Sequence, residues 1–203
     1  MTARYLDLLT SPYVKAAQEA NGVHRPSSRV PDVETGPDVL TAREAEFIAS
    51  RDSFYMATVG AEGWPYLQHR GGPAGFVKVL GPRQFGLADF RGNRQYISVG
   101  NLEADNRAAF FFMDYPRRAR LKLLGRVRQV SLTDAPDLAA ALLDSDYAAK
   151  VERGLLVDVE AYDWNCPQHI TPRFSVAELA PSIEALKARI AELEGELSKA
   201  RAG

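Results

Sequence analysis

Two glycine-rich breaks in the sequence carry the polar side chains best suited to binding an anionic ligand. The first break is the run Gln68-His69-Arg70-Gly71-Gly72, at the end of an expected strand. Glycine lets the backbone approach a flat ligand closely, so that exposed N–H groups can bond to its edge. The same run also has a purely structural interpretation, a β-bulge with charges that face solvent.

The second break is the stretch from Asp89 to Asn101, in which the loop Asn93-Arg94-Gln95 leads into an expected short helix with Ser98 just inside it. Free N–H groups at a helix N-terminus, the helix dipole and a guanidinium group together suit a phosphate. The alternative is a solvated loop that caps the helix.

A third cationic pair, Arg120 and Lys122, lies on one face of an expected strand. Two or three cations would balance a dianionic phosphate and stabilise an anion that forms beside it. The alternative is that both residues lie on an outward, solvated face of the sheet.

Several well-known catalytic motifs are absent. The sequence has no phosphate-binding Walker lysine loop, no GxGxxG, no GxSxG and no HExxH. His24, His69 and His169 are far apart and lack cysteine pairs, so we expect no preformed structural zinc site. Cys166 lies three residues before His169, but a packed or loop thiol is favoured over a catalytic pair.

Composition restricts the class of protein. The 203 residues suit one domain with short extensions. The net charge of −1 provides no basic field, so we expect neither nucleic acid nor a membrane surface as a partner. The single cysteine excludes an intrachain disulfide, and no secretory signal or long apolar run is visible. We therefore expect a soluble, cytoplasmic protein.

The elements that must position these residues are mostly short strands. A capping-box pattern, Thr41 to Glu44, predicts the start of a helix that buries Phe47 and Ile48. Alternating patterns separated by glycine and proline then predict a meander typical of a barrel or sandwich. The expected strands are 54–60, 64–70, 76–80, 84–90, 107–114, 120–130 and 155–162, and the other expected helices are 3–20 (broken at Pro12), 96–102 and 135–143.

The last segment has a different period. Its apolar residues are spaced 4-3-4-3-4, an a/d seam, and are Leu179, Ile183, Leu186, Ile190, Leu193 and Leu197. The seam could pack on its own barrel. A partner helix in a dimer is favoured, because so regular a 3.5-residue period suits a supercoil better than a sheet.

Taken in order, these segments resemble the pyridoxamine 5′-phosphate oxidase-like superfamily of FMN-binding split barrels. The stretches that carry the resemblance are 54–73, 87–102, 105–112 and 164–170. The resemblance implies a mainly β (β+α) fold: a six-stranded Greek-key split β-barrel with peripheral helices, here followed by a coiled-coil-like helix. It also implies a homodimer with FMN at the subunit interface. We divide the chain into an N-terminal extension (1–40), an FMN-binding barrel domain (41–177) and a C-terminal amphipathic helix (178–203).

The resemblance also implies roles for individual residues. Arg70 corresponds to a strand arginine near the flavin, with His69 and Gly71 beside it. Asn93, Arg94, Gln95 and Ser98 fall in the phosphate-binding loop and the helix that follows. Arg120, with Lys122 near it, matches a flavin-contacting position that the partner subunit donates. Trp164, Asn165 and Gln168 belong to a segment that resembles one closing over the ring.

The expected function is that of an FMN-dependent oxidoreductase that takes electrons from a nicotinamide or another small organic donor. The family's substrate motif Arg-x-His is absent at Thr171-Pro172-Arg173, so oxidation of pyridoxamine phosphate is not expected. No catalytic acid or base is identified. The alternatives are a non-catalytic FMN- or haem-binding protein, with His69 or His169 as haem ligand, and a structural dimer with a vestigial site. A deazaflavin in place of FMN also remains open.

Overall fold

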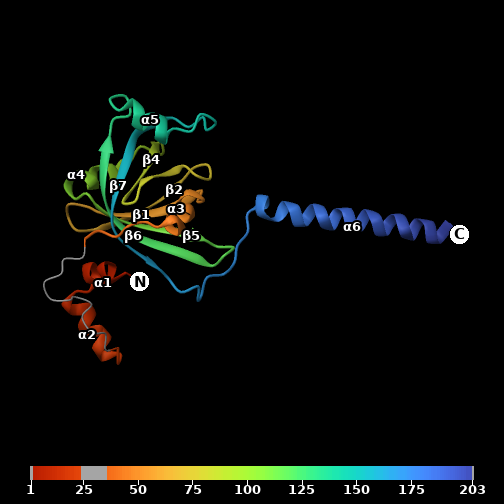
Figure 1. Cartoon of the computed structure of the whole chain (residues 1–203), viewed down its shortest axis with the longest axis horizontal. Helices are drawn as coiled ribbons and strands as arrows, with labels where there is room; N and C mark the ends of the chain where they lie inside the picture. The colour runs from red at the N-terminus through yellow and green to blue at the C-terminus, as the bar shows by residue number, and fades with distance from the viewer. Residues whose placement is uncertain (1, 24–35, 203) are drawn as a thin grey trace.

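A single antiparallel sheet of seven strands forms the body of the protein in a computed structural model that describes residues 2–23 and 36–202 (Figure 1). The strand order is β2-β1-β5-β6-β7-β4-β3. The strands are β1 (Ser53–Val59), β2 (Pro65–Gly71), β3 (Val77–Gly81), β4 (Gln84–Phe90), β5 (Arg107–Asp114), β6 (Ala119–Val130) and β7 (Val151–Trp164).

The inward face of this sheet is packed with aromatic and aliphatic side chains. Phe54, Phe85, Phe110 and Phe112 are almost completely buried and contact one another with ring centroids 4.9 to 6.1 Å apart. Alternate residues of a strand point to opposite faces, and β6 follows this rule, with one face buried and the other partly exposed. The expected β+α split barrel is therefore confirmed.

The number of strands expected, six, was wrong. All seven segments that the alternating pattern predicted form strands, and the short β3 pairs with β4 at one edge of the sheet. β7 is also longer than expected, because its first residues, such as Glu152 and Arg153, are polar yet continue the pairing with β4.

Six helices surround or extend the barrel in the described part of the chain. They are α1 (Ala3–Leu9), α2 (Pro12–Ala20), α3 (Ala42–Ala49), α4 (Ile97–Ala104), α5 (Pro136–Leu142) and α6 (Val176–Ala202). None of these helices is both long and apolar enough to cross a bilayer.

Helix α3 begins at the predicted capping box, in which Glu44 accepts a hydrogen bond from the backbone N–H of Thr41 at 3.0 Å. Ile48 is completely buried and Phe47 partly so. The indole of Trp164, at the end of β7, donates to Glu44 Oε1 at 2.6 Å and packs edge-on against Phe47. These contacts tie α3 to the end of the longest strand.

Helix α1 is attached to β7 by polar contacts. Arg4 pairs with the Glu160 carboxylate at 2.5 Å, and the hydroxyl of Thr2 donates to the carbonyl of Tyr162 at 2.8 Å. Helix α1 thus packs on the barrel, and its Tyr5 is buried beside Lys122.

Helix α6 projects away from the barrel as a single long rod (Figure 1). Its seam residues are 41 to 65% exposed, so the seam does not pack on the barrel of the same chain. That alternative interpretation of the seam is wrong.

Candidate functional site

A small polar hollow, here called the loop pocket, lies where β2, the end of β4 and the start of α4 meet. Its volume is about 60 Å³, enough for a group the size of a few water molecules but not for a ring system. The residues that line it are Tyr66, Gln68, Arg70, Asp89, Phe90, Gly92, Asn93, Arg94, Gln95, Tyr96, Ile97, Ser98, Val99 and Glu152. The fold therefore brings together five of the predicted residues: Arg70, Asn93, Arg94, Gln95 and Ser98.

The backbone of this loop turns sharply before α4 begins. Arg94 and Tyr96 both have left-handed backbone angles, φ 63° and φ 53°. The side chain of Asn93 accepts a hydrogen bond from the backbone N–H of Gln95 at 3.1 Å and so closes the turn. Tyr96 occupies the N-cap of α4 without capping it through its side chain. The positive end of the helix dipole therefore faces the loop pocket.

An ion network fixes the arginine on the β2 side of the loop pocket. Arg70 pairs with the Asp89 carboxylate, and Arg153 Nε lies 3.4 Å from the other oxygen of Asp89. Both Arg70 and Asp89 side chains are only 8 to 10% exposed. The Nε atom of Arg70 is buried and has no hydrogen-bond partner in the described part of the chain. A buried, unsatisfied donor of this kind is expected where a ligand binds.

A second carboxylate, Glu152, lies at the rim of the loop pocket. It accepts hydrogen bonds from Arg91 at 2.8 Å and from the Tyr96 hydroxyl at 3.0 Å. The bond from Arg91 is the main reason why the pKa of Glu152 lies below its ordinary value. Glu152 is therefore a fixed anion that holds the loop through Arg91 and Tyr96.

Ser98 and Gln68 act as a pair. The buried hydroxyl of Ser98 donates to Gln68 Oε1 at 2.8 Å. Because the amide oxygen is occupied, the NH₂ group of Gln68 is the part left to donate into the loop pocket. Ser98 thus orients a donor group of Gln68, which belongs to the first polar run indicated by the sequence.

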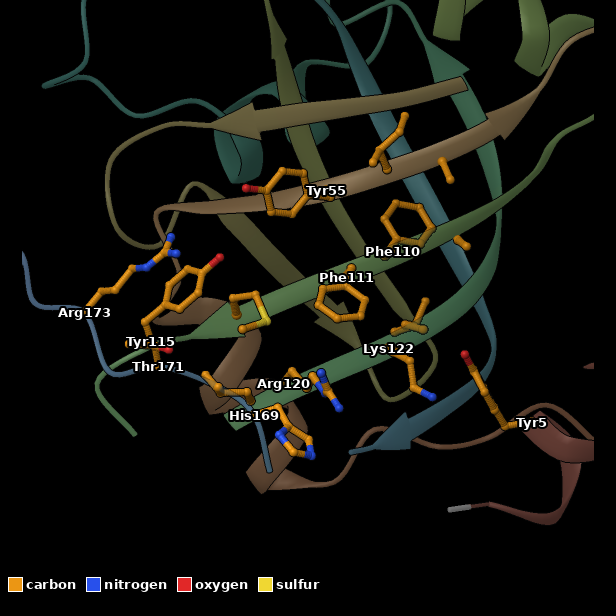
Figure 2. A pocket seen from close by; sticks show the side chains of 16 residues that line it. Tyr5, Tyr55, Phe110, Phe111, Tyr115, Arg120, Lys122, His169, Thr171 and Arg173 are labelled. Carbon is orange, nitrogen blue, oxygen red and sulfur yellow. The ribbon is translucent and has the colours of Figure 1, made fainter. Parts of the chain in front are cut away.

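A much larger hollow, here called the outer pocket, lies on the outward face of β1, β5 and β6 (Figure 2). Its volume is about 560 Å³, within the range of ligand pockets. It is lined by Tyr5, Tyr55, Ala57, Leu67, Ala109, Phe110, Phe111, Met113, Tyr115, Arg120, Lys122, Leu123, His169, Ile170, Thr171 and Arg173. Figure 2 shows Arg120 and Lys122 on β6, with Tyr5 at one end and Arg173 beside Tyr115 at the other.

The cations of the outer pocket differ in their partners. Lys122 pairs with the buried Asp163 at 2.8 Å and lies over the Tyr5 ring at 4.9 Å. Burial raises the pKa of Tyr5, and the nearby Lys122 ammonium offsets part of this increase. Arg120 Nε is buried without a hydrogen-bond partner among the described residues. Arg173 stacks on Tyr115 at 5.0 Å.

The two pockets lie on opposite faces of β2. Gln68 and Arg70 face the loop pocket, whereas Leu67 faces the outer pocket. Alternate strand residues point to opposite sides, so Arg120 and Lys122 do not join the arginines of the loop pocket within one protomer.

The remaining predicted residues line neither pocket in the described part of the chain. His69 is exposed on the edge strand and packs edge-on against Tyr55, and Gly71 lies beside it. The indole of Trp164 donates to Glu44 and packs against Phe47, both in α3. Asn165 donates its backbone N–H to the Arg120 carbonyl at 3.3 Å, which places the segment next to the outer pocket. Gln168 is exposed.

Sequence reasoning missed the residues that complete each pocket from distant segments. Glu152 and Arg153 complete the loop pocket beside Asp89, and Tyr5 and Arg173 bound the outer pocket. The charged residues just before the expected 155–162 strand were the available signal for the first group.

Comparison with protein-family models gives a match that covers most of the chain. A family model described as pyridoxamine 5′-phosphate oxidase matches residues 40–182. No curated protein matches.

Three solved structures illustrate the distant similarity. A conserved hypothetical protein of Mycobacterium tuberculosis is 16% identical, with TM-score 0.47 over 71% of this chain and 97% of its own. HupZ of Group A Streptococcus is 14% identical, with TM-score 0.47 over 66% and 100%. An FMN-binding protein from Syntrophomonas wolfei is 12% identical, with TM-score 0.43 over 60% and 83%. Likenesses this distant say nothing about activity.

Proposed function

Because the chain belongs to the pyridoxamine 5′-phosphate oxidase family, we propose that it binds FMN and works as an oxidoreductase with a small organic electron donor. The observation that carries the proposal is the loop pocket, a phosphate-sized hollow at the N-terminus of α4 lined by Arg70 and Arg94. When bound, the flavin would supply the redox chemistry by accepting a hydride and passing on its electrons.

The phosphate would be held in the loop pocket by charge and by the helix terminus. Arg70 and Arg94 neutralise its two negative charges, and the first N–H groups of α4 donate to its oxygens. The NH₂ group of Gln68 adds a further donor. Asp89 keeps Arg70 in place, since a guanidinium has donors left after one carboxylate contact.

The flavin ring would extend out of the loop pocket, which is too small to contain it. The outer pocket of the same protomer lies on the other side of β2, so its cations are not available to that ring. We propose that Arg120 and Lys122 of a second protomer lie over the ring instead. There they would stabilise the anion of the reduced flavin. The site would then be complete only in a dimer.

The first test is the visible absorption spectrum of the purified protein after addition of FMN and desalting. Retained flavin bands would support the proposal. Riboflavin, which lacks the phosphate, should be washed out; equal retention of riboflavin would overturn the assignment of the loop pocket. A deazaflavin, if retained instead of FMN, would be recognised by its different spectrum.

Arg94→Ala should weaken FMN binding about 10- to 100-fold, the effect of losing hydrogen bonds between charged groups. Arg128→Ala is the matched control. It removes the same charge from an exposed ion pair between Arg128 on β6 and Asp158 on β7. Isothermal titration would give both affinities. An equal loss of FMN affinity in the two variants would indicate a general effect of charge. It would contradict the proposed contact between Arg94 and the phosphate.

The electron donor is tested separately. NADH and NADPH should each be added to the flavin-loaded protein under anaerobic conditions while the flavin absorbance is followed. Bleaching would identify a nicotinamide donor, and its absence with both would restrict the proposal to other donors.

A second candidate, a binding or sensing protein without turnover, is favoured by one observation. His169 lines the outer pocket together with several aromatic residues. A Soret band that appears with haem and is lost in His169→Ala would support haem binding there. No Soret band would remove this candidate.

A further inference from the structure

Helix α6 presents an apolar stripe that nothing in the described chain covers. The stripe residues Val176, Leu179, Ile183, Leu186, Ile190, Leu193 and Leu197 are 41 to 84% exposed. The helix has 27 residues, about 40 Å at a rise of 1.5 Å per residue, and stands clear of the barrel (Figure 1). An isolated helix is marginal in water, and most helices in proteins are stabilised by the packing of an apolar face.

The residue types at the stripe select a particular assembly. The a positions are Val176, Ile183, Ile190 and Leu197, and the d positions are Leu179, Leu186, Leu193 and Ala200. β-branched side chains at a, combined with leucine at d, favour two parallel strands over three or four. Only the last heptad departs from this rule, because it has Leu197 at a and Ala200 at d.

We propose that α6 pairs with α6 of a second copy of this chain, in parallel and in register, as a two-stranded coiled coil. Each a residue then meets the same residue of the second copy, and so does each d residue. Both barrels lie at the same end of the coil, next to the two copies of Val176.

The charges beside the stripe fit this arrangement. In a parallel dimer, each g position faces the following e position of the other helix. Arg189 at g therefore faces Glu194 at e, and Glu196 at g faces Arg201 at e. All of these pairs join opposite charges. Within its own helix Arg189 also contacts Glu192 at 2.5 Å, and this contact leaves its remaining donors available.

An antiparallel pair of the same length is disfavoured by the same residues. There, g positions face g positions and e positions face e positions. Arg189 would face Arg189 of the second copy, and Lys187 would face Lys187 of the second copy. Like charges in contact oppose association, so charge as well as core composition selects the parallel form.

The two residues of α6 that disfavour a helix both occupy the outward f position. Pro181 lies inside the helix and Gly195 has open space around it. Neither therefore disturbs the proposed contact, although both weaken the isolated helix. Pairing would supply the stability that the helix lacks alone.

Cysteine cross-linking in the full-length chain tests both pairing and orientation. In a Cys166→Ser background, Ala200→Cys at d should form an interchain disulfide under mild oxidation. Ser198→Cys at b, on the outer surface, is the control. The disulfide should form at least about tenfold faster in Ala200→Cys than in Ser198→Cys, because pairing gives the two thiols a high effective concentration.

Two results of this experiment would overturn the proposal. Equal rates for the two cysteines would indicate random collisions. No disulfide at position 200 would indicate an antiparallel pair, a different partner or a helix that does not pair. Circular dichroism of both variants should match that of the unsubstituted chain, since these positions lie far out on α6; a variant that fails this check is replaced by Leu193→Cys at d.

A charge exchange tests the register. The basic variant carries Glu194→Lys and Glu196→Lys, and the acidic variant carries Arg189→Glu and Arg201→Glu. Each alone faces like charges across the coil, whereas a mixed pair faces opposite charges throughout. With Ala200→Cys in both, mass spectrometry of the cross-linked mixture should show mixed dimers in at least about tenfold excess over either homodimer. The statistical ratio of two to one would contradict the proposal. Neither readout depends on flavin, so the two proposals fail independently.

Discussion

Arg70 is held in position by its own chain before any ligand is considered. Asp89 takes one nitrogen of its guanidinium, and Arg153 lies against the other oxygen of Asp89. The arrangement leaves Arg70 Nε buried and without a hydrogen-bond partner among residues 2–23 and 36–202. A donor fixed in this way loses little conformational freedom on binding an anion, which is the advantage of preorganisation.

Gly125 is a residue at which stability is predicted to depend on the absence of a side chain. It lies at the register shift between β6 and β7, where an added Cβ would lie 2.7 Å from Val157 Cγ1 and 2.9 Å from the Asp158 carbonyl oxygen. Gly125→Ala should lower the free energy of unfolding by about 1–3 kcal/mol through overpacking. Thermal or urea denaturation measures the loss.

Gly81→Ala is the matched control for that substitution. Gly81 also lies in a strand, but an added Cβ would have no atom within 4 Å. Its stability should change little. If both substitutions changed the free energy of unfolding equally, overpacking at the register shift would not explain the loss in Gly125→Ala.

At the residue scale, the sequence predicted the loop pocket better than its surroundings. Arg94 and Ser98 were found because a loop entering a helix is a local pattern. Asp89 and Arg153 become neighbours only through the pairing of β4 with β7, and no local pattern contains that information. The indole of Trp164 bonds to Glu44 and packs against Phe47, and no local pattern indicates these contacts because both residues are remote in sequence.

Strand β2 is the element that separates the two pockets. Its alternating side chains supply Arg70 to one pocket and Leu67 to the other. As an edge strand it pairs only with β1 in the described sheet. A single strand thus determines which polar groups can reach a ligand within one protomer.

Helix α1 depends on the ionisation of Glu160. Hydrogen bonds from Arg4, and then from Arg126, lower the pKa of Glu160 below 4.5, although burial opposes them. A carboxyl with a lowered folded pKa stabilises the fold fully above pH 4.5 and loses that contribution as the pH falls through the lowered value. Acid should therefore loosen α1.

Glu160→Gln tests this dependence. At neutral pH the variant should exchange the amide protons of α1 faster and lose about 0.5–1 kcal/mol, as expected for partly screened pairs. It should also respond less to acid between pH 4.5 and the lowered pKa. Unchanged exchange in α1 would mean that Thr2 and Tyr5 alone hold the helix.

At the scale of elements, the sequence predicted the bounds of a strand best where glycine and proline mark the turn beside it. Gly81 and Pro82 delimited β4, whose predicted and observed bounds agree. β7 was predicted too short, because its first residues are polar on both faces near the loop pocket. The six-strand count came from the resemblance, whereas the alternating segments themselves numbered seven.

The whole molecule is predicted to form its flavin site from two chains, and a mixing experiment can test this. Arg94→Ala and Arg120→Ala should each impair FMN binding when pure. Subunits mixed at equal amounts form about one half mixed dimers, and each mixed dimer would contain one intact site if the two residues come from different chains. About a quarter of all sites should then recover FMN binding.

No recovery, despite subunit exchange shown by mass spectrometry, would place both residues in the site of one chain. The control is a mixture of Arg94→Ala with Gln68→Ala. Both residues line the loop pocket of the same protomer. One chain of that mixed dimer would still lack Arg94 and the other Gln68, so no site should recover.

The projecting α6 also determines how the molecule moves through water. A rod of about 40 Å attached to a compact barrel increases friction without adding much mass. The protein should leave a gel-filtration column earlier than its 22.4 kDa per chain suggests and tumble anisotropically. Shape alone would thus imitate a larger assembly on such a column, and sedimentation or light scattering becomes the proper measure of how many chains travel together.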